Sequence, residues 1–400
     1  MRRRWVLVAG GTSLLGAAVT GTALLADRTE AAPVPHLLSG PDWYTPDPAA
    51  EAAWLARGSV PGDGGPHGDM VRRALLDLRA LSRANGAVAA GPAPSWNHAW
   101  PRDSAFAAVA LARTGHLGDA VRVLRFLTAV MLPDGGFEAR YRLDGSGPPD
   151  DRRRQDDGAG WALWALRAVL DSPGGHAHAE ELRDLLEGAL DFTLDRTRSG
   201  HRLPDPSPDY WERREASLTL GAVAPLLAGL EAAAAVLSRL RERTRAREVS
   251  AAAGRLAELV HDRFAPAGYP RYAQNPDAGV DAATAFLLPP FTARAGPAVL
   301  AAFDTYQERA RRPAGGLAPG AGWRDDGVSW TPQTALVAWV GARIGRRDQA
   351  NERLDWLNVH RTAWGSIPEK VLADGSPAGP APLGWSAACA VLAVDTLERG

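Results

Sequence analysis

Three segments of the sequence place tryptophan beside charged side chains. They are residues 95–103, 206–215 and 364–370. Flat aromatic rings can stack on the apolar C–H faces of a sugar, while charged and amide groups form paired hydrogen bonds with its hydroxyls. The residue types in these segments therefore indicate a pocket for a polyhydroxylated ligand.

In the first segment the binding candidates are Trp100, Arg102 and Asp103. A guanidinium and a carboxylate at adjacent positions can each make two hydrogen bonds to neighbouring hydroxyls. The pair also has an ordinary interpretation, in which Asp103 caps the helix that follows and Arg102 is its ion partner.

Two glutamates are candidates for acid–base chemistry. Glu212 follows Trp211, and a carboxyl group packed against a ring loses water, which favours its protonated form and suits a general acid. Glu369 precedes Lys370, whose charge favours the ionised form that a general base requires. The ordinary alternatives are ion pairs, Glu212 with an arginine that follows it and Glu369 with Lys370 on the surface.

The elements that must position these residues are helices. Apolar residues recur at three- and four-residue spacing, and no comparable set of alternating strands is visible. The expected helices cover residues 69–84, 104–114, 118–131, 159–170, 177–196, 218–240, 244–264, 281–288, 298–311, 332–343, 347–360 and 385–397. Sequential hairpins of this number can close as six inner and six outer helices, whose loops at one end form a pocket. We therefore predict an all-α fold, an (α/α)6 barrel or six-hairpin toroid. A solenoid of helical repeats is the alternative, but no fixed period is evident.

The N-terminal part of the chain differs from the rest. Arg2, Arg3 and Arg4 precede an Ala- and Gly-rich apolar stretch at residues 5–26, so we predict an export signal at residues 1–32. An uncleaved membrane anchor is the alternative, because about twenty apolar residues can span a bilayer. The Pro- and Gly-rich residues 33–65 predict a linker or irregular segment, and residues 66–400 a single catalytic domain. A secreted or cell-envelope protein is expected.

Composition excludes several classes of function. The formal net charge of −1 gives no general attraction to nucleic acid or anionic lipid. The single cysteine, Cys389, excludes an internal disulfide and a cysteine cluster for zinc, and the nine histidines lack a metal-binding motif. We therefore expect no metal, no cofactor, no nucleic-acid partner, and no membrane contact beyond the N-terminal segment.

Together the three segments resemble glycoside hydrolase family 15, the glucoamylase-like enzymes of the six-hairpin glycosidase superfamily. Residues 100–106 are similar to the family's Trp-x-Arg-Asp loop, residues 211–212 to its aromatic-Trp-Glu segment, and residues 367–369 to the segment with the general base. Residues 155–158, with Asp156 and Asp157, are similar to a turn that lines the pocket. Arg324 lies in a passage similar to one whose arginine reaches the substrate. The matches occur in family order, but Lys370 stands where a glutamine is common.

The resemblance implies an exo-acting, inverting glycoside hydrolase that releases glucose from the non-reducing end of an α-glucoside or oligosaccharide. It implies Glu212 as general acid and Glu369 as general base. The sugar-binding residues that it implies are Trp100, Arg102, Asp103, Asp156, Asp157, Trp211 and Arg324. Inversion requires carboxyl groups roughly 6.5–9.5 Å apart, against about 5–5.5 Å in a retaining pair. The alternatives are a catalytically silent carbohydrate-binding or cell-envelope protein, and a phosphorylase, lyase or cyclase on the same barrel.

Overall fold

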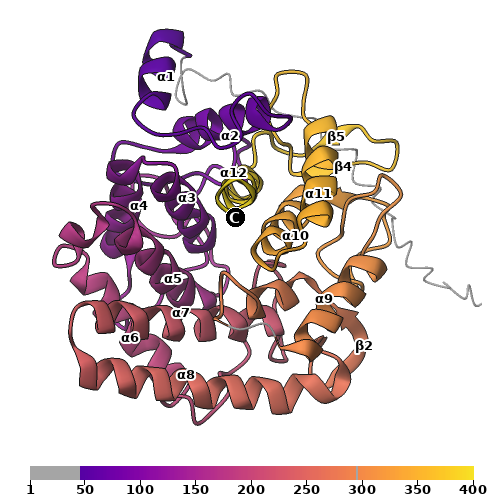
Figure 1. Ribbon diagram of the computed structural model, residues 1–400. Helices are drawn as coiled ribbons and strands as arrows, with labels where there is room; N and C mark the ends of the chain where they lie inside the picture. Colours follow the sequence, from indigo (N-terminus) through magenta and orange to yellow (C-terminus); the bar gives the residue numbers. More distant parts are fainter. Residues whose placement is uncertain (1–45, 294–295) are drawn as a thin grey trace, which may run out of the picture. The chain divides into compact units, whose positions relative to one another are not determined.

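The computed structural model describes residues 46–293 and 296–400, so the predicted export signal and residues 33–45 of the predicted linker lie outside the described residues. Six helical elements form an inner ring. They are α3 (Pro101–Arg113), α5 (Asp157–Asp171), α7 (Leu220–Arg239), η3 (Ala282–Leu287), α10 (Thr331–Arg343) and α12 (Gly384–Arg399). Each packs against the next, and α12 packs against α3 to close the ring (Figure 1).

Six outer helices pack against this ring. They are α2 (Gly68–Leu81), α4 (Leu117–Val130), α6 (Arg183–Arg196), α8 (Arg243–Phe264), α9 (Pro297–Arg309) and α11 (Arg347–Val359). Outer and inner elements alternate along the chain, so the architecture is a series of helical hairpins closed as an (α/α)6 barrel. The predicted fold class is confirmed.

The inner elements are apolar on nearly every side because both their faces are buried. α7 is long and apolar enough to cross a membrane, yet 89% of its most apolar stretch is buried, as in the core helix of a barrel. Glycine permits close approach of α5 to α7, since a Cβ added at Gly160 would lie 2.1 Å from the Pro225 carbonyl oxygen. The rings of Phe106, Trp164 and Phe291 contact one another inside the barrel.

Three local predictions differ from the structure. Residues 281–288, expected as an α-helix, form the 3-10 helix η3, in which every residue is buried. The helix expected at residues 177–196 divides into η1 (Gly175–His178) and α6. Part of the predicted linker forms α1 (Pro48–Leu55), because Asp47 caps its first turn and the Trp54 ring is buried against His116.

Short strands fix two of the connecting loops. β1 (Pro270–Tyr272) pairs antiparallel with β2 (Asn275–Val280). β3 (Ser329–Trp330), β4 (Lys370–Val371) and β5 (Pro377–Ala378) form an antiparallel sheet in that order. This second sheet ties the loop before α10 to the loop before α12, so the N-terminal ends of two inner helices are held together.

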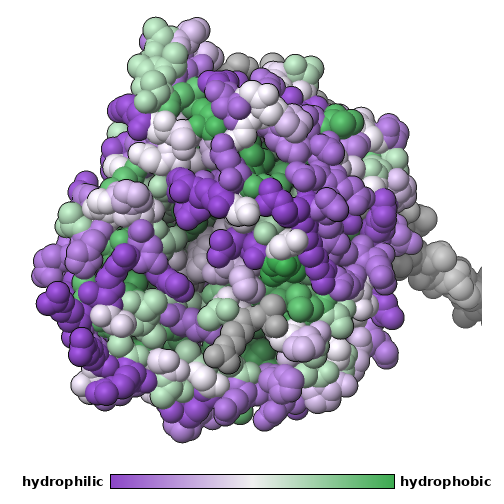
Figure 2. All heavy atoms as spheres, in the orientation of Figure 1, coloured by the Kyte–Doolittle hydropathy of each residue, from purple (hydrophilic) through white to green (hydrophobic). Residues whose placement is uncertain are grey.

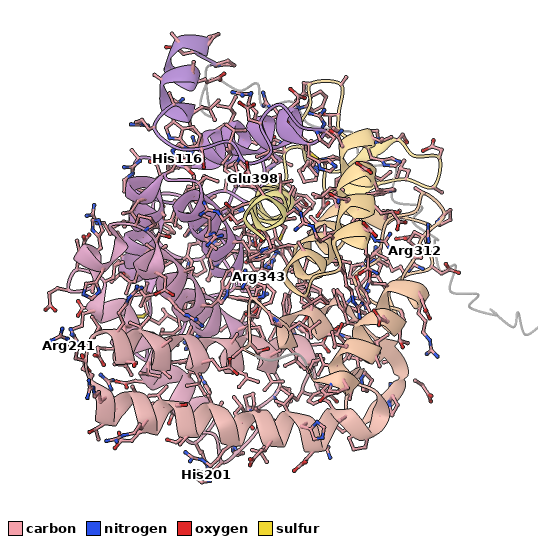
Figure 3. All side chains as sticks on the ribbon, viewed as in Figure 1. His116, His201, Arg241, Arg312, Arg343 and Glu398 are labelled. Atoms are coloured by element: carbon pink, nitrogen blue, oxygen red, sulfur yellow. The ribbon has the colours of Figure 1, made fainter. Side chains whose placement is uncertain are left out.

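The two ends of the barrel differ. The C-terminal ends of α3, α5, α10 and α12 surround a cavity of about 750 Å³, whose lining includes Arg343 at the end of α10 (Figure 3). Asp171 is the one acidic residue in that lining, so no pair of carboxyl groups faces across it. Hydrophilic residues predominate on the face of the molecule shown in Figure 2. The sequence-predicted site lies at the opposite end, where the inner helices begin.

Candidate active site

A cavity of about 290 Å³ lies at the N-terminal ends of the inner helices. Most of its lining residues belong to the loops that precede α3, α7, α10 and α12. The lining comprises Ala90, Ser95, Trp96, Trp100, Arg102, Asp103, Arg140, Arg152, Tyr210, Trp211, Glu212, Pro319, Trp323, Trp330, Pro332, Gln333, Glu369, Leu383 and Trp385. Aromatic rings and charged groups thus share one cavity, as a sugar pocket requires.

Six of the nine sequence-predicted site residues line this cavity: Trp100, Arg102, Asp103, Trp211, Glu212 and Glu369. They come from three separate segments of the chain, and closure of the barrel brings them together. Their positions agree with the predicted roles, while the roles themselves stay predictions.

The other three predicted residues do not line the cavity. Asp157 is buried in the first turn of α5, where its carboxylate accepts a hydrogen bond from Trp161 Nε1 at 3.0 Å, and burial raises its pKa to about 7. Asp156 turns toward Arg196 of α6, at 3.6 Å. Arg324 is exposed, with its guanidinium 5.8 Å from the centroid of Trp323. The sequence indicates that these side chains lie near the loops of the site, but it does not determine the direction in which they point.

Arg102 and Asp103 lie in the first turn of α3 and are almost completely buried. Arg102 Nη2 donates to Asp103 Oδ2 at 3.1 Å, and the guanidinium carbon lies 4.9 Å from the centroid of Trp385. Asp103 is not the helix cap, because that position belongs to Trp100. Nη1 and Nε of Arg102 have no hydrogen-bond partner within the described residues, so this buried guanidinium keeps donors for a ligand.

Glu369 is buried rather than on the surface, with 8% of its side chain exposed. Trp96 Nε1 donates to Oε1 at 3.0 Å, and Lys370 Nζ lies 3.4 Å from Oε2. Burial raises the pKa of Glu369; Lys370 and Trp96 oppose that rise, and the Asp103 charge adds to it. The alternative of a surface pair with Lys370 is therefore wrong, and the ionised form that Lys370 was expected to favour is opposed by burial.

The backbone around Glu369 is tightly fixed. Its amide donates to the Pro380 carbonyl at 2.9 Å, and its carbonyl accepts from the Thr331 amide at 3.0 Å. Gly379 has a φ of +74°, and a Cβ there would lie 2.8 Å from Glu369 Oε2. Glycine is required at this position both for its backbone conformation and for room beside the carboxyl group.

A buried hydrogen bond ties this loop to the outer ring. Ser366, three residues before Glu369, donates from Oγ to Asp77 of α2 at 3.0 Å. Burial raises the pKa of Asp77 to about 6, against the lowering effect of Arg73 at 2.6 Å. The candidate base therefore stands on a loop anchored at both backbone and side chain.

Glu212 has a different environment from the one that its aromatic neighbours predict. Its side chain is 27% exposed, and hydrogen-bond donors contact the carboxyl group. Arg152 Nη1 lies 2.9 Å from Oε2, Gln155 Nε2 lies 2.9 Å from Oε1, and Arg102 Nη1 lies 3.6 Å from Oε1. The expected desolvation by a ring is therefore wrong, and the expected partner among the following arginines is replaced by Arg152.

Glu212 also has an unusual backbone, with a φ of +55°. Few non-glycine residues adopt this conformation, which costs of order 1 kcal/mol or more and requires support from its surroundings. The support comes from Asp209, whose carbonyl accepts from the Glu212 amide at 2.8 Å and whose carboxylate accepts from the Trp211 amide at 2.9 Å.

Asp209 belongs to a buried cluster around Arg271 of β1. The Arg271 guanidinium donates to Asp209 at 2.9 Å, to Glu215 at 2.7 Å and to Asp281 at 2.8 Å. Its carbon lies 3.8 Å from the centroid of Trp211. One buried cation thus holds both the carboxylates that flank the Glu212 turn and the ring that precedes it.

Sequence reasoning missed several residues of the cavity. Trp96 and Tyr210 carried a signal, since both lie in the tryptophan-bearing segments, and Trp323 adjoins Arg324, whereas Trp330 and Trp385 lie outside those segments. Gln155 carried a signal through the family-like turn at residues 155–158, whereas no sequence feature indicated the contact of Arg152 with Glu212. Arg152 stands in a run of three arginines, which in sequence is indistinguishable from a solvated loop.

The two candidate carboxyl groups line the same cavity as Asp103, whose charge interacts with both. Within the described residues, no hydrogen bond or ion pair joins Glu212 to Glu369. The Asp103 charge raises the pKa of Glu369, while burial raises the pKa of Asp103 itself, with Arg102 opposing and Glu212 adding to the rise. Three carboxyl groups therefore surround one cavity, with the Arg102 guanidinium among them.

No protein-family model and no curated protein matches the sequence. Solved structures do match the fold. A glycosidase variant in complex with glucose has a TM-score of 0.70 at 20% identity, over 88% of this chain and 99% of that one. A bacterial glucoamylase complexed with acarbose has a TM-score of 0.71 at 16% identity, over 87% of this chain and 57% of that one. A glucoamylase from Saccharomycopsis fibuligera has a TM-score of 0.64 at 13% identity, over 90% and 98%. The chain therefore has the six-hairpin barrel fold of the glucoamylase-like glycosidases.

Proposed function

We propose that this protein is an exo-acting, inverting glycoside hydrolase that releases glucose from the non-reducing end of an α-glucoside or oligosaccharide. The observation that carries the proposal is the placement of Glu212 and Glu369 on one aromatic-lined cavity without direct contact between them. The similarity of the barrel to glycosidases and glucoamylases supports it.

The proposed reaction uses the two carboxyl groups on opposite faces of the sugar. Glu212 donates its proton to the glycosidic oxygen as the bond between that oxygen and the anomeric carbon breaks. A water molecule forms the new bond to the anomeric carbon from the other face, and its proton passes to Glu369. One glycoside and one water molecule thus give one free sugar and one alcohol.

The remaining pocket residues position the substrate and stabilise charge. Arg102 has donors free for hydroxyls, and Asp103 brings negative charge near the anomeric carbon, where the transition state gains oxocarbenium character. Trp100 and Trp211 offer rings for stacking. The barrel beneath is filled by packed rings such as Phe106, which contacts Trp385, so the cavity admits a chain end rather than a chain middle.

The test is hydrolysis of maltose, isomaltose, trehalose, kojibiose and soluble dextrin by the purified protein, with the product anomer read by NMR. We expect β-glucose as the first product from one or more of them. Release of α-glucose overturns inversion, and sugar binding without release from any of them favours a silent carbohydrate-binding protein instead.

Two variants test the residue roles. Glu212→Gln should lower turnover by about 10²–10⁴-fold while leaving sugar binding largely intact, because the amide cannot donate the catalytic proton. Glu369→Ala should lose activity, and azide should restore it with the β-glucosyl azide as product. A full rate in either variant removes the role assigned to that residue.

We also propose that the protein acts outside the cytoplasm, on the sequence pattern of residues 1–32. Cell fractionation of the full chain tests this, since recovery in the cytoplasmic fraction alone overturns it.

A further inference from the structure

A second cavity adjoins the sugar pocket and shares two residues with it. It has a volume of about 320 Å³ and is lined by Asp150, Asp151, Arg152, Arg153, Gln155, Pro208, Glu212, Arg213 and Arg214. The shared residues are Arg152 and Glu212. Glu212 thus stands at the boundary between the two cavities.

The position of Glu212 gives the second cavity its place in the reaction, an argument that depends on the proposed function. A general acid contacts the glycosidic oxygen, so the glucose lies on one side of it and the leaving group on the other. Trp100, Arg102 and Asp103 line only the first cavity, which is therefore the side for glucose. The second cavity is the side for the leaving group, and we call it the leaving-group cavity.

Arginine dominates the lining of the leaving-group cavity, although the whole chain has a formal net charge of −1. Arg153 and Arg214 are exposed and have no ion pair or hydrogen bond within the described residues. Arg213 contacts rings rather than acids, with its guanidinium carbon 4.6 Å from the centroid of Trp323. Three guanidinium groups therefore remain without an acidic partner.

The acidic residues of the lining do not balance this charge. Asp150 is already shared between Arg140 and Arg152, whose Nε lies 3.1 Å from Oδ1. Asp151 is exposed and makes no ion pair within the described residues. With Glu212 carrying its proton, two aspartates face four arginines.

Arg152 links this charge to the catalytic step. In the structure the Glu212 carboxyl group accepts hydrogen bonds from Arg152 at Oε2 and from Gln155 at Oε1, and Arg102 Nη1 lies 3.6 Å from Oε1. Once Glu212 carries its proton for the glycosidic oxygen, its negative charge no longer pairs with Arg152, which keeps only Asp150 as an acidic partner. An anion in the leaving-group cavity offers Arg152 another acceptor.

We propose that the leaving group carries an anionic group, a carboxylate or a phosphate, which the arginines of the leaving-group cavity bind and which draws Arg152 away from Glu212. Arginine pairs with both anions through two parallel hydrogen bonds, so the same residues suit either one.

The experiment compares leaving groups that share one skeleton. A disaccharide that the protein cleaves is converted at its reducing end to the alditol, the aldonate, and the alditol with a terminal phosphate. The linkage and the glucose are then the same in all three. We expect kcat/KM for at least one anionic substrate to exceed that for the alditol by about tenfold at low ionic strength, the combined effect of two or three partly exposed ion pairs. The ratio should fall toward one at high salt.

Variants assign the effect to the cavity. The double substitution Arg153→Gln and Arg214→Gln should lower the ratio of anionic to neutral kcat/KM several-fold. Arg263→Gln, which removes an exposed arginine of α8 that has no ion pair with any residue the structure describes, is the matched control and should leave the ratio unchanged.

The outcomes separate this inference from the proposed function. Equal kcat/KM for all three substrates, or an effect that the double variant retains, overturns the anionic leaving group and leaves the hydrolase intact. Cleavage of none of the neutral glycosides and none of their anionic derivatives overturns both. The anionic substrate with the higher kcat/KM identifies whether the cavity prefers a carboxylate or a phosphate.

Discussion

Replacement of Lys370 by methionine should move the acidic limb of the pH–rate profile to higher pH. A general base works as the carboxylate, so activity is lost as pH falls through its pKa. Burial already raises the pKa of Glu369, and Lys370 is the largest influence that opposes the rise. Methionine keeps the bulk of the side chain but removes the charge, so the pKa should rise further and the limb should follow it.

The size of the shift follows from the geometry. Lys370 Nζ lies 3.4 Å from Glu369 Oε2, with 15% and 8% of the two side chains exposed. At that distance Coulomb's law gives about 1 kcal/mol in water and about 5 kcal/mol at an effective dielectric constant of 20. Opposite charges this close typically move a carboxyl pKa by about 1–3 units. Since the pair is neither fully solvated nor dry, we expect a shift of about 1–2 pH units.

The assay is kcat/KM on a neutral glycoside from about pH 3 to 9, which reports the ionisation of the free enzyme. Lys370→Arg keeps the charge and is the matched control, so its limb should stay close to that of the wild type. Lys370 is the one lysine of the chain, so no other ammonium side chain contributes. A limb that stays in place in Lys370→Met, or moves to lower pH, refutes both the base assignment and the electrostatic argument.

Four further substitutions test the packing and the support of the site. Gly160→Ala should destabilise the fold by roughly 3 kcal/mol in denaturant titrations, because the new Cβ would lie 2.1 Å from the Pro225 carbonyl oxygen. Gly254→Ala, in a helix and with nothing within 4 Å, should instead stabilise it by about 0.5–1 kcal/mol. Arg271→Met leaves three buried carboxylates without their cation and should cost about 3–5 kcal/mol, with a smaller loss at pH 4 than at pH 7. Trp96→Phe removes a hydrogen bond to the candidate base and should lower kcat about tenfold with an unchanged circular dichroism spectrum; a wild-type kcat contradicts this role.

The sequence determined most of the helical architecture. Spacing of apolar residues is a short-range property, and a helix with a buried stripe shows it wherever it lies in the chain. It therefore located the helices of both rings, except that residues 281–288 take the tighter 3-10 form. Periodicity does not distinguish the two forms over so short a segment.

The sequence also determined which loops carry the site, because aromatic and charged residues are concentrated there. Trp100, Arg102 and Asp103 are neighbours along the chain, so their grouping required no knowledge of the fold. The same holds for Trp211 and Glu212. In a short motif of this kind the residues stay close together in space, so they can contribute to one site wherever the fold places them at one end of a barrel.

Only the tertiary structure decided what surrounds each carboxyl group. Trp96 and Glu369 are separated by 273 positions, and Arg152 and Glu212 by 60, yet each pair is in hydrogen-bond contact. They excluded the alternative of a surface Glu369 and reversed one expectation, since donors contact the partly exposed Glu212 carboxyl group. The physical reason is that burial and long-range pairing are consequences of ring closure, and nothing in the local order of residues specifies them.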